Sequence, residues 1–576
     1  MLSQTLLLEL LKKELKISSV ELKQYEKEAK KLKKDLETYV IEKGKVDEQD
    51  LYTSAAKKLD IPLVALKGRE IKKDVLNLVP APLAQAHQLI AFDATKKEIL
   101  LAMLDPEDIQ TIEFLQRKTG LSPKVSLTTP GDMKDALRRY HADLNEEMGL
   151  VSLSQDTSLT PAQEKDLKKA AEELPIVNIV NSMLEHAVYE GASDIHIEPV
   201  EKEVLVRYRV DGMLKQVMSL PKAVQSGITA RIKILATLKI DEHMLPQDGR
   251  FKLQVQDEKF SFRVSILPVY DGEKIVLRLL HEGQKAVSLD QLGLLPKARA
   301  LLEEAIERPH GMILVTGPTG SGKTTTLYSV LGMLNTGDVN ISTIEDPIEY
   351  HVKGINQSQV NTRVGFTFAA GLRAFLRQDP DIIMVGEIRD EETAEIAVHA
   401  AMTGHLVLST LHTNDAPTTL PRLLDMGIPP FLVAFTVNII LGQRLVRKIC
   451  EHCKEAYSLG KGEVQALQKV LAPSRLKQLY KEQGLDISKK DAVSHTFYRG
   501  AGCRRCGKSG YKGRIGIYEV LDVDKELAQK INARATATEI KQYANKKGMV
   551  TMLEDGILKA KTGITTIEEV LRATRD

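Results

Sequence analysis

The sequence predicts a multidomain α/β protein, and three observations lead to that prediction. The chain has 576 residues, which is too many for one hydrophobic core and implies roughly three to four domains. Through its second half, apolar runs of strand length alternate with helical patterns, as expected of a mostly parallel sheet covered by helices on both faces. Between one such strand and the next helix lies a glycine-rich segment, Gly317–Thr324, which is typical of a phosphate-binding α/β domain.

The composition limits the kind of protein and its partners. Lys and Arg total 80 and Asp and Glu total 78, so the chain is nearly neutral and no global field favours nucleic acid. The segment Met1–Leu15 is shorter than a membrane span and lacks a basic region before its leucines, and no later apolar run reaches spanning length. We therefore expect a cytosolic chain that reaches a membrane only through partners. In such a chain, four cysteines favour a metal site or free thiols over disulfides.

Changes of pattern along the chain predict where its domains begin and end. One polar, Ser/Thr-rich segment has no periodicity and predicts a flexible linker. The expected divisions are an N-terminal α/β module at 1–141, the linker at 142–164, a second α/β domain at 165–282, a connector at 283–296, and a third domain at 297–576 that includes a four-cysteine subdomain at 450–506. Strands are expected at 99–104, 204–210, 260–267, 312–315, 341–344, 382–385 and 406–408.

The first 36 residues have a helical pattern that places Leu7, Leu11 and Leu15 on one face, with lysines and glutamates around them. Three interpretations stay open at this point. The segment is an anchor on a membrane surface, a helix that packs against a partner, or a plain solvated helix.

The glycine-rich segment matches the phosphate-binding loop G-x-x-x-x-G-K-[ST] in the strand-loop-helix context that this motif requires. Its glycines let backbone N–H groups turn toward anionic oxygens, and the next helix adds its positive N-terminal end. Lys323 can reach the β- and γ-phosphates, and the Thr324 hydroxyl can ligate Mg²⁺. The alternative is a glycine-rich turn that serves only the backbone. The expected nucleotide-binding residues are Gly317, Pro318, Thr319, Gly320, Ser321, Gly322, Lys323, Thr324 and Thr325.

A nucleoside triphosphatase also needs a carboxylate near the γ-phosphate to position or deprotonate water. The strand at 382–385 delivers Glu387 just beyond its end. Such a strand usually ends in an acidic pair, but here Gly386 takes the place of the first acid. Metal binding would therefore depend on Thr324, on water and on a second acidic stretch. The alternative is that Glu387 has no catalytic part.

Two further strand ends supply polar residues. Glu345 and Glu349 follow the strand at 341–344, and His412 follows the strand at 406–408, where it could contact the γ-phosphate. Ligands of open α/β sheets bind beyond the carboxyl ends of the strands, so all of these residues can belong to one site. Alternatively, Glu349 is a solvated loop acid and His412 is a structural histidine.

Guanidinium groups are best suited to meet the charge that develops on a transferred phosphoryl group. Candidates lie both near the acids of the third domain and in the second domain. They are Arg373, Arg377, Arg389, Arg250, Arg263 and Arg278. Because a single arginine is more often a surface or ion-pair residue, the sequence does not select among them.

All four cysteines fall in two C-x-x-C pairs, Cys450 with Cys453 and Cys503 with Cys506. This spacing is typical of a tetrahedral Zn²⁺ site, and a closed four-thiolate site leaves no open position for substrate. We therefore expect a structural zinc, with helices in the long segment between the pairs. The alternative is reduced thiols or a redox pair.

Across essentially its whole length the chain resembles the secretion-superfamily motor ATPases of the type II secretion and type IV pilus assembly branch. The motifs that carry the resemblance are, in chain order, Gly191-Ala-Ser-Asp-Ile-His-Ile-Glu-Pro, Leu245-Pro-Gln-Asp-Gly-Arg, Gly317–Thr324, Thr343-Ile-Glu-Asp-Pro-Ile-Glu, Asp381–Arg389, Ser409-Thr-Leu-His-Thr-Asn-Asp and the ending from Gly548. The resemblance implies a RecA-like P-loop ATPase core, a PAS-like α/β second domain and a small N-terminal α/β module.

The resemblance also implies roles for the site residues. The stretch Glu345–Glu349 matches the aspartate box, Asp381–Glu387 the atypical Walker B strand, and His412 the histidine box. The matching catalytic residues are Glu387, Lys323, His412, Glu345, Glu349, the second-domain arginines Arg263 and Arg278, and the ATPase-domain arginines Arg373 and Arg389. ATP, Mg²⁺ and Zn²⁺ are the implied ligands.

Partners follow from the same resemblance. It implies a homohexamer in which the second domain swings against the ATPase domain, with an inner-membrane platform protein and a cytoplasmic ring component as partners. Some members bind cyclic di-GMP through an Arg-Leu-Gly start, but the aligned residues here are Asp35-Leu36-Glu37, so platform docking is the expected role of the module. Pilin assembly is the expected function. The alternatives are pseudopilus assembly in type II secretion, a retraction motor, a nucleic-acid translocase and a non-catalytic scaffold.

Overall fold

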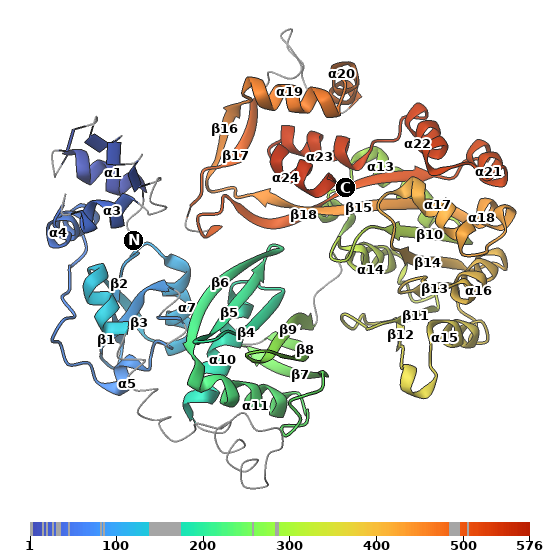
Figure 1. Ribbon diagram of the computed structural model, residues 1–576. Helices are drawn as coiled ribbons and strands as arrows, with labels where there is room; N and C mark the ends of the chain where they lie inside the picture. Colours follow the sequence, from blue (N-terminus) through green and yellow to red (C-terminus); the bar gives the residue numbers. More distant parts are fainter. Residues whose placement is uncertain are drawn as a thin grey trace. The chain divides into compact units, whose positions relative to one another are not determined.

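In the computed structural model the chain divides after His281 into two units, residues 1–281 and 282–576 (Figure 1). The structure describes residues 4–13, 17–18, 21–22, 24–25, 28–29, 36–43, 46–80, 83–84, 87–137, 174–255, 258–282, 287–482, 496–503 and 506–575. The linker predicted at 142–164 lies outside these residues. Both units combine helices and sheets, which confirms the predicted multidomain α/β class.

The first unit begins with a small α/β module on a three-stranded sheet. Strand β2 lies in the middle, antiparallel to β1 and parallel to β3. Helix α7 makes the crossover that a parallel pair requires. The strand predicted at 99–104 is confirmed as β2. The elements are α1 (Gln4–Lys13), α3 (Leu36–Glu42), α4 (Glu48–Leu59), α5 (Lys73–Leu76), β1 (Leu89–Ala94), β2 (Glu98–Met103), α7 (Ile109–Thr119) and β3 (Ser122–Leu127).

The apolar face of α1 packs into the core of its own module. Leu7, Leu10 and Leu11 are buried there together with Leu51 and Tyr52 of α4. None of the three interpretations of this segment anticipated that arrangement, because a helical pattern shows which residues share a face but not what covers the face. The interpretations as a membrane-surface anchor, a partner helix or a solvated helix are therefore wrong for the described part.

The rest of the first unit is a six-stranded sheet in the order β6-β5-β4-β9-β8-β7. Burial alternates along β5 and β8, as expected where one face of an antiparallel sheet packs on a core. The apolar residues of α10 and α11 share that core. The strands predicted at 204–210 and 260–267 are confirmed. The elements are α10 (Leu174–Tyr189), β4 (Asp194–Pro199), β5 (Glu203–Val210), β6 (Met213–Pro221), η1 (Lys222–Val224), α11 (Gln225–Leu235), β7 (Gln247–Val255), β8 (Glu258–Val269) and β9 (Gly272–Glu282).

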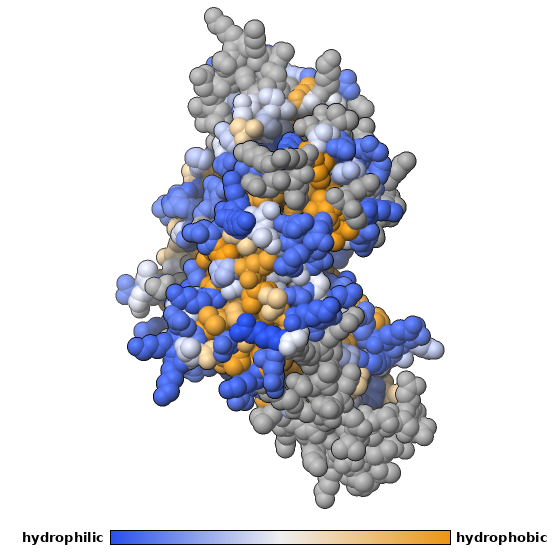
Figure 2. Space-filling view, turned by 90° about the vertical axis from the view of Figure 1, so that its left-hand side faces the viewer, coloured by the Kyte–Doolittle hydropathy of each residue, from blue (hydrophilic) through white to orange (hydrophobic). Residues whose placement is uncertain are grey.

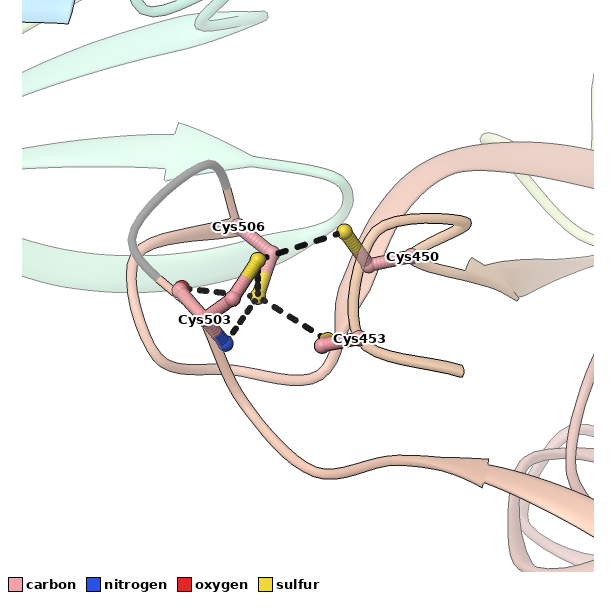
Figure 3. Close-up of side chains that lie close together, drawn as sticks. All are labelled: Cys450, Cys453, Cys503 and Cys506. Atoms are coloured by element: carbon pink, nitrogen blue, oxygen red, sulfur yellow. Dashed lines mark hydrogen bonds between the residues drawn. The ribbon is translucent and has the colours of Figure 1, made fainter. Parts of the chain in front are cut away.

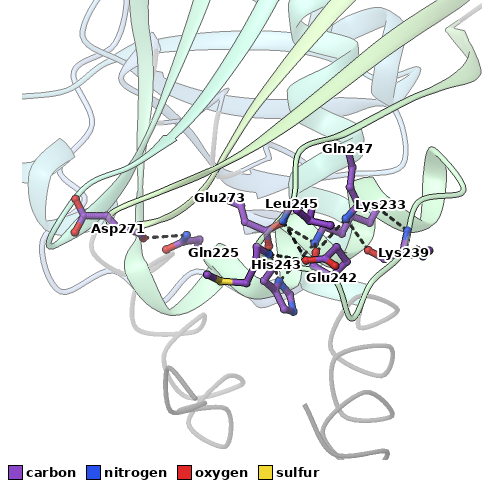
Figure 4. A network of polar contacts seen from close by, with 10 residues as sticks. Gln225, Lys233, Lys239, Glu242, His243, Leu245, Gln247, Asp271 and Glu273 are labelled. Carbon is purple, nitrogen blue, oxygen red and sulfur yellow. Dashed lines mark hydrogen bonds and ion pairs between the residues drawn. The ribbon is translucent and has the colours of Figure 1, made fainter. Parts of the chain in front are cut away.

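A buried charge holds the loop that leads into the motif at 245–250 (Figure 4). Lys233 of α11 is fully buried, its Nζ lies 2.7 Å from Glu273 Oε1, and it donates to the backbone oxygen of Glu242 at 2.6 Å. His243 Nδ1 lies 2.7 Å from the other Glu273 oxygen. Because a buried charge without its partner is costly, this network fixes the loop conformation.

The second unit is built on a seven-stranded sheet in the order β12-β11-β13-β14-β10-β15-β18. Its pairs are parallel except the last, in which β18 runs antiparallel to β15. The predicted strands are confirmed as β10 (Gly311–Thr316), β11 (Ile341–Glu345), β13 (Ile382–Val385) and β14 (Leu406–Leu411), and β12 (Asn356–Gln359), β15 (Val437–Ile449) and β18 (Tyr511–Asp522) are additional. The mostly parallel, RecA-like core is thus present.

Helices cover both faces of this sheet, and every residue of β10, β13 and β14 is buried. One face packs on α15 to α18, α21 and α22, and the other on α12 to α14. The helices are α12 (Leu289–Leu292), α13 (Pro296–Ile306), α14 (Lys323–Leu334), η2 (Thr362–Val364), α15 (Phe368–Phe375), α16 (Glu391–Met402), α17 (Ala416–Asp425), α18 (Pro430–Thr436), α21 (Lys525–Asn532), α22 (Ala537–Lys546), α23 (Met552–Lys561) and α24 (Ile567–Thr574).

The cysteine-bearing segment lies between β15 and β18. It contains the hairpin strands β16 (Lys454–Ser458) and β17 (Thr496–Gly500) and the helices α19 (Lys461–Val470) and α20 (Pro473–Glu482). The helices expected between the cysteine pairs are therefore present. Leu467, Leu476 and Phe497 of this segment share a core with Ile557 of α23, so the segment packs on the C-terminal helices.

Hydrophilic residues cover most of the described surface in the view of Figure 2, with apolar residues gathered between them. Large exposed apolar side chains include Met244, Tyr270 and the pair Phe431 and Phe435. Among the described helices, none is both long enough and apolar enough to cross a bilayer.

Glu569 of α24 ties the C-terminal helix to the sheet. Its carboxylate is 2.5 Å from Arg447 Nη2 on β15 and 2.8 Å from Arg572 Nη2. Burial by itself would raise the pKa of Glu569, but the hydrogen bonds from Arg447 and Arg572 outweigh burial and lower the pKa to about 2. A depressed carboxyl pKa stabilises the fold above the unfolded-state value, and this stabilisation is lost as the pH falls toward 2.

Glu569→Gln is therefore expected to lower the free energy of unfolding at pH 7 by up to about 3 kcal/mol. The deficit relative to wild type should shrink as the pH is lowered from 5 toward 3, because the wild-type carboxylate loses its advantage there. Urea denaturation across that pH range measures the difference in the free energy of unfolding. Glu568→Gln is the control, because Glu568 is the exposed neighbour of Glu569. An equal deficit at every pH would show that packing, not charge, is what the carboxylate contributes.

Candidate active site

The phosphate-binding loop leaves β10 and enters α14 directly. Gly322 precedes the helix with φ of 90°, and α14 begins at Lys323. Pro318, Thr319 and Gly320 are exposed, so the loop presents its backbone outward at the positive end of the helix. The geometry fits the phosphate chain of a nucleotide.

Strand β15 contacts the phosphate-binding loop through Gln443. The Gln443 side chain donates to the backbone oxygen of Ser321 at 2.8 Å and accepts from the Thr326 hydroxyl at 2.8 Å. A Cβ at Gly317 would lie 2.4 Å from the backbone oxygen of Gln443, at a φ of 148°. Only glycine fits there, because any side chain would force the loop and β15 apart.

Gly317→Ala is accordingly expected to weaken nucleotide binding by at least about tenfold, since the loop must shift to admit the methyl group, and a shift that costs about 1.4 kcal/mol gives that factor. Titration of the purified chain with a fluorescent ATP analogue measures the dissociation constant. Gly320→Ala is the matched control, because a Cβ at Gly320 has no atom within 4 Å, although its φ of 79° also favours glycine. Equal weakening in both variants would attribute the loss to backbone conformation and not to the contact with β15.

Lys323 lies folded over the phosphate-binding loop. Its Nζ donates to the backbone oxygens of Gly317 at 2.8 Å and Pro318 at 3.3 Å. Burial lowers the pKa of Lys323, and the charge of Glu387 acts in the opposite direction. The ammonium group is thus held at the loop, within range of the Glu387 charge. Thr324 and Thr325 follow in the first turn of α14.

Glu387 stands just beyond the end of β13 with its side chain only 10% exposed. Its Oε1 lies 2.6 Å from Arg389 Nη2, and its Oε2 lies 3.2 Å from His412 Nε2. His412 comes from the end of β14, the strand next to β13. The structure therefore brings together three of the predicted residues, an acid flanked by an arginine and a histidine.

Steric crowding explains why a glycine, Gly386, precedes Glu387. A Cβ at Gly386 would lie 3.2 Å from the backbone oxygen of Ile344 and 3.3 Å from the Cα of Glu345 on the neighbouring strand. The Gly386 amide donates to that same oxygen at 2.8 Å. An acid in this position, as in the usual strand end, would crowd β11.

Glu345 and Glu349 differ sharply in their surroundings. Glu345 is 2% exposed and accepts hydrogen bonds from Thr343 at 2.6 Å, from Gln357 at 3.2 Å and from Tyr328. Burial raises the pKa of Glu345 against these hydrogen bonds, and the charge of Glu349 raises it further. Because Tyr328 belongs to α14, this carboxyl joins the helix behind the loop to β11.

Glu349, by contrast, has an oxygen with nothing to bind among the described residues. Its Oε2 is buried and lacks a hydrogen-bond partner there. A buried carboxylate oxygen in this state is costly unless a donor or a cation meets it. Of the two acids in the box, Glu349 is therefore the one available to water or a metal ion.

The four arginines that the resemblance names as catalytic lie in different surroundings. Arg389 pairs with Glu387, whereas Arg373 of α15 pairs with the exposed Glu392 of α16 at 2.6 Å. In the first unit, Arg278 of β9 lies 3.0 Å from Asp194 and is about half exposed, and Arg263 of β8 lies opposite Arg250 of β7. In the second unit, Arg389 lies beside Glu387, whereas Arg373 pairs with a different acid.

The four cysteines converge at the ends of β15 and β18 (Figure 3). Sulfur–sulfur distances are 3.7 Å for Cys450 and Cys503, 3.7 Å for Cys503 and Cys506, and 3.9 Å for Cys453 and Cys506. Zn–S bonds of about 2.3 Å in a tetrahedron separate the sulfurs by about 3.8 Å, whereas a disulfide would need about 2.05 Å. The donor set fits zinc and does not fit disulfides.

Backbone amides complete the surroundings of this cluster. The amides of Cys503 and Gly510 each donate to Cys506 Sγ at 3.2 Å. Burial would raise the pKa of Cys506, but the hydrogen bonds from these amides prevail and lower it to about 7. Thiolate character at this sulfur favours metal binding.

Comparison with known proteins identifies the family. Residues 169–572 match the family described as Type II/IV secretion system protein. The chain belongs to this family. Residues 59–147 match the MshEN domain, and this match begins after Asp35-Leu36-Glu37. As a member of the family, the chain is an ATPase.

Relatives within the family extend over most of the chain. The type IV pilus assembly ATPase PilB of Myxococcus xanthus is 41% identical over 572 residues, which cover 98% of both chains. The type II secretion system protein E of Pseudomonas aeruginosa is 45% identical over 434 residues, covering 75% of this chain and 82% of its own. Among solved structures, the pilus retraction motor PilT with bound ADP is 28% identical with a TM-score of 0.45, covering 68% of this chain and 96% of that chain.

The sequence did not predict several residues that shape the site of this family member. Gln443 holds the loop, and Tyr328 and Gln357 hold Glu345. Thr316, at the end of β10, bonds Thr413 beyond β14 at 2.6 Å. A usable signal existed only for Gln443, since it is a polar residue that follows the apolar run at 439–441 in a buried strand.

Proposed function

We propose that this ATPase powers type IV pilus assembly. The observation that carries the proposal is its 41% identity to a pilus assembly ATPase across 98% of both chains, the N-terminal module included. The alternative is pseudopilus assembly in type II secretion, which the 45% identity to a type II secretion protein over 434 residues supports.

In the proposed reaction Glu387 is the base that orients and deprotonates the attacking water. Its pairing with His412 at 3.2 Å and Arg389 at 2.6 Å supports this role, because the two partners fix the direction of the carboxylate. Lys323, released from the loop carbonyls, meets the β- and γ-phosphates. His412 then lies where it can respond to the γ-phosphate.

Thr324 and Glu349 would hold Mg²⁺, Glu349 through water. When bound, the metal ion supplies charge neutralisation on the β- and γ-phosphates. Glu349 is the better candidate of the two box acids because its Oε2 has no partner within the described chain. Glu345 acts as a positioning residue, since donors already occupy its oxygens.

Mechanical work would arise because nucleotide binding and hydrolysis change the position of the second domain. We infer a homohexamer in which Arg263 and Arg278 of the second domain approach the phosphates of a bound nucleotide and leave on hydrolysis. The exposure of Arg278 on β9 supports this role. Arg373 would act at a subunit boundary, since its ion-pair partner among the described residues is an exposed acid.

We propose a role for the N-terminal module within the predicted division of the chain. That division is 1–141, 142–164, 165–282, 283–296 and 297–576. The N-terminal module would dock on an inner-membrane platform protein, with a cytoplasmic ring component nearby, so the chain would be cytoplasmic and held at the inner membrane by partners. The start Asp35-Leu36-Glu37, without the arginine and glycine of the binding motif, makes cyclic di-GMP binding doubtful, and no nucleic acid is expected.

Deletion of the gene in its host, with complementation, tests the proposal. Wild-type gene should restore surface fibres, Lys323→Ala should not, and Lys525→Ala, an exposed lysine of α21, should act as wild type. Fibres are counted by electron microscopy and exported enzymes are assayed in the medium. Loss of exported enzymes with fibres retained would assign the chain to type II secretion instead.

A further inference from the structure

Two histidines and a glutamate meet where the N-terminal module contacts helix α10. His87 precedes β1, His186 lies in the last turn of α10, and Glu190 follows that helix. Their ligand atoms all lie within 4.8 Å of one another. None of them takes part in the nucleotide site or in the cysteine cluster.

The distances are those of a metal site that needs only a small adjustment. His87 Nε2 lies 3.0 Å from His186 Nε2, which lies 3.9 Å from Glu190 Oε1. Tetrahedral zinc with bonds of about 2.0–2.1 Å holds such donors about 3.3 Å apart, a value between the two distances. His186 and Glu190 are four residues apart, and the Glu190 amide donates to the His186 oxygen at 2.9 Å, so both side chains share one face.

A carboxylate orients the first histidine from behind. Asp108, the N-cap of α7, has its Oδ2 2.7 Å from His87 Nδ1 and accepts from the Thr111 hydroxyl at 2.7 Å. A histidine that donates Nδ1–H to a carboxylate presents the lone pair of Nε2. This carboxylate–histidine pairing behind the donor atom is the arrangement that accompanies zinc ligands.

The second histidine is buried and also turns Nε2 toward the same point. His186 is 3% exposed, and Phe114 and Tyr208 pack on its ring at 6.5 and 5.6 Å. Its Nδ1 has no hydrogen-bond partner within the described chain, which leaves its polar contacts to Nε2.

We propose that His87, His186 and Glu190 bind a zinc ion that fastens the N-terminal module to α10, with Asp108 as the positioning residue. Two imidazoles and one carboxylate are a ligand set that zinc accepts, and a fourth position is left for water. The rival is a plain N–H···N hydrogen bond between the two histidines. In that case Glu190 does not contribute to the contact, so substitution of Glu190 distinguishes the two interpretations.

The test uses the full chain, stripped of metal by a chelator and titrated with Co²⁺ or Zn²⁺ without nucleotide. Two equivalents per chain are expected, one with the intense sulfur-to-cobalt charge transfer of the cysteine cluster and one with only the weaker bands of nitrogen and oxygen ligands. Glu190→Gln should weaken the second equivalent at least tenfold, and Asp108→Asn by about 10–100-fold, with the cysteine bands unchanged.

Glu185→Gln is the matched control. Glu185 lies on α10 and pairs with Lys118 of α7 at 2.7 Å. This variant therefore removes a contact between α10 and the N-terminal module without removing a proposed ligand. It should bind both equivalents as wild type does. A single equivalent with only cysteine bands in wild type would overturn the proposal, and so would a second equivalent that Glu190→Gln leaves unchanged.

Discussion

Glu387→Gln is expected to lower kcat for ATP hydrolysis by about 10²–10⁴-fold, the usual contribution of a general base. The amide has nearly the same shape, and its carbonyl oxygen can still accept a hydrogen bond from Arg389, which lies 2.6 Å from the carboxylate. Its NH₂ group takes the place of the oxygen that lies 3.2 Å from His412. It cannot take a proton from water. Nucleotide affinity should change only a few-fold, since the loop and Lys323 remain intact.

Single-turnover phosphate release at saturating Mg²⁺ and ATP measures the chemical step, and titration with a fluorescent analogue measures binding. Glu395→Gln is the control, because Glu395 of α16 is exposed and pairs only weakly with His399 at 3.9 Å. Turnover near that of wild type in Glu387→Gln would show that another group activates the water. Loss of binding as well would mean that the carboxylate supports the loop.

The strands that carry the site were predictable because both of their faces are buried. Continuous apolar runs at 312–315 and 382–385 mark such strands without knowledge of their neighbours, and β10 and β13 fall within a residue of those limits. The residues that follow them must then gather at one edge of the sheet. Glu387 and His412 do meet there, although their strands are separated in the chain by α16.

Contacts between elements far apart in the chain were not predictable in this way. Gln443 reaches the phosphate-binding loop from β15, more than a hundred residues later, and no local pattern states that β15 pairs with β10. Tyr328 and Glu345 are only 17 residues apart, but no local pattern states that this face of α14 packs against β11. The helical pattern of the first 36 residues likewise marked an apolar face but could not show that the module's own core covers it.

Cys503→Ser is expected to remove one zinc equivalent and to destabilise the second unit. A ligand that binds only the folded state and is present at about 1,000 times its dissociation constant contributes about 4 kcal/mol. For a unit the size of residues 282–576, this corresponds to a fall in Tm of about 7 °C. The effect should spread beyond the cluster, because the Cys450 amide bonds Gly510 at 3.0 Å and so joins the ends of β15 and β18. Elemental analysis and calorimetry measure the two quantities.

Metal rescue distinguishes a structural zinc from free thiols or a redox pair. Chelator-treated wild type should regain its Tm when Zn²⁺ is added, whereas Cys503→Ser should not, since three sulfurs cannot close the tetrahedron. Ser458→Ala at the exposed end of β16 controls for disturbance of the segment. Because β15 also carries Gln443, loss of the metal should weaken ATP binding in parallel with Tm. A wild-type chain that keeps its Tm without metal, with four thiols reactive, would contradict the zinc site.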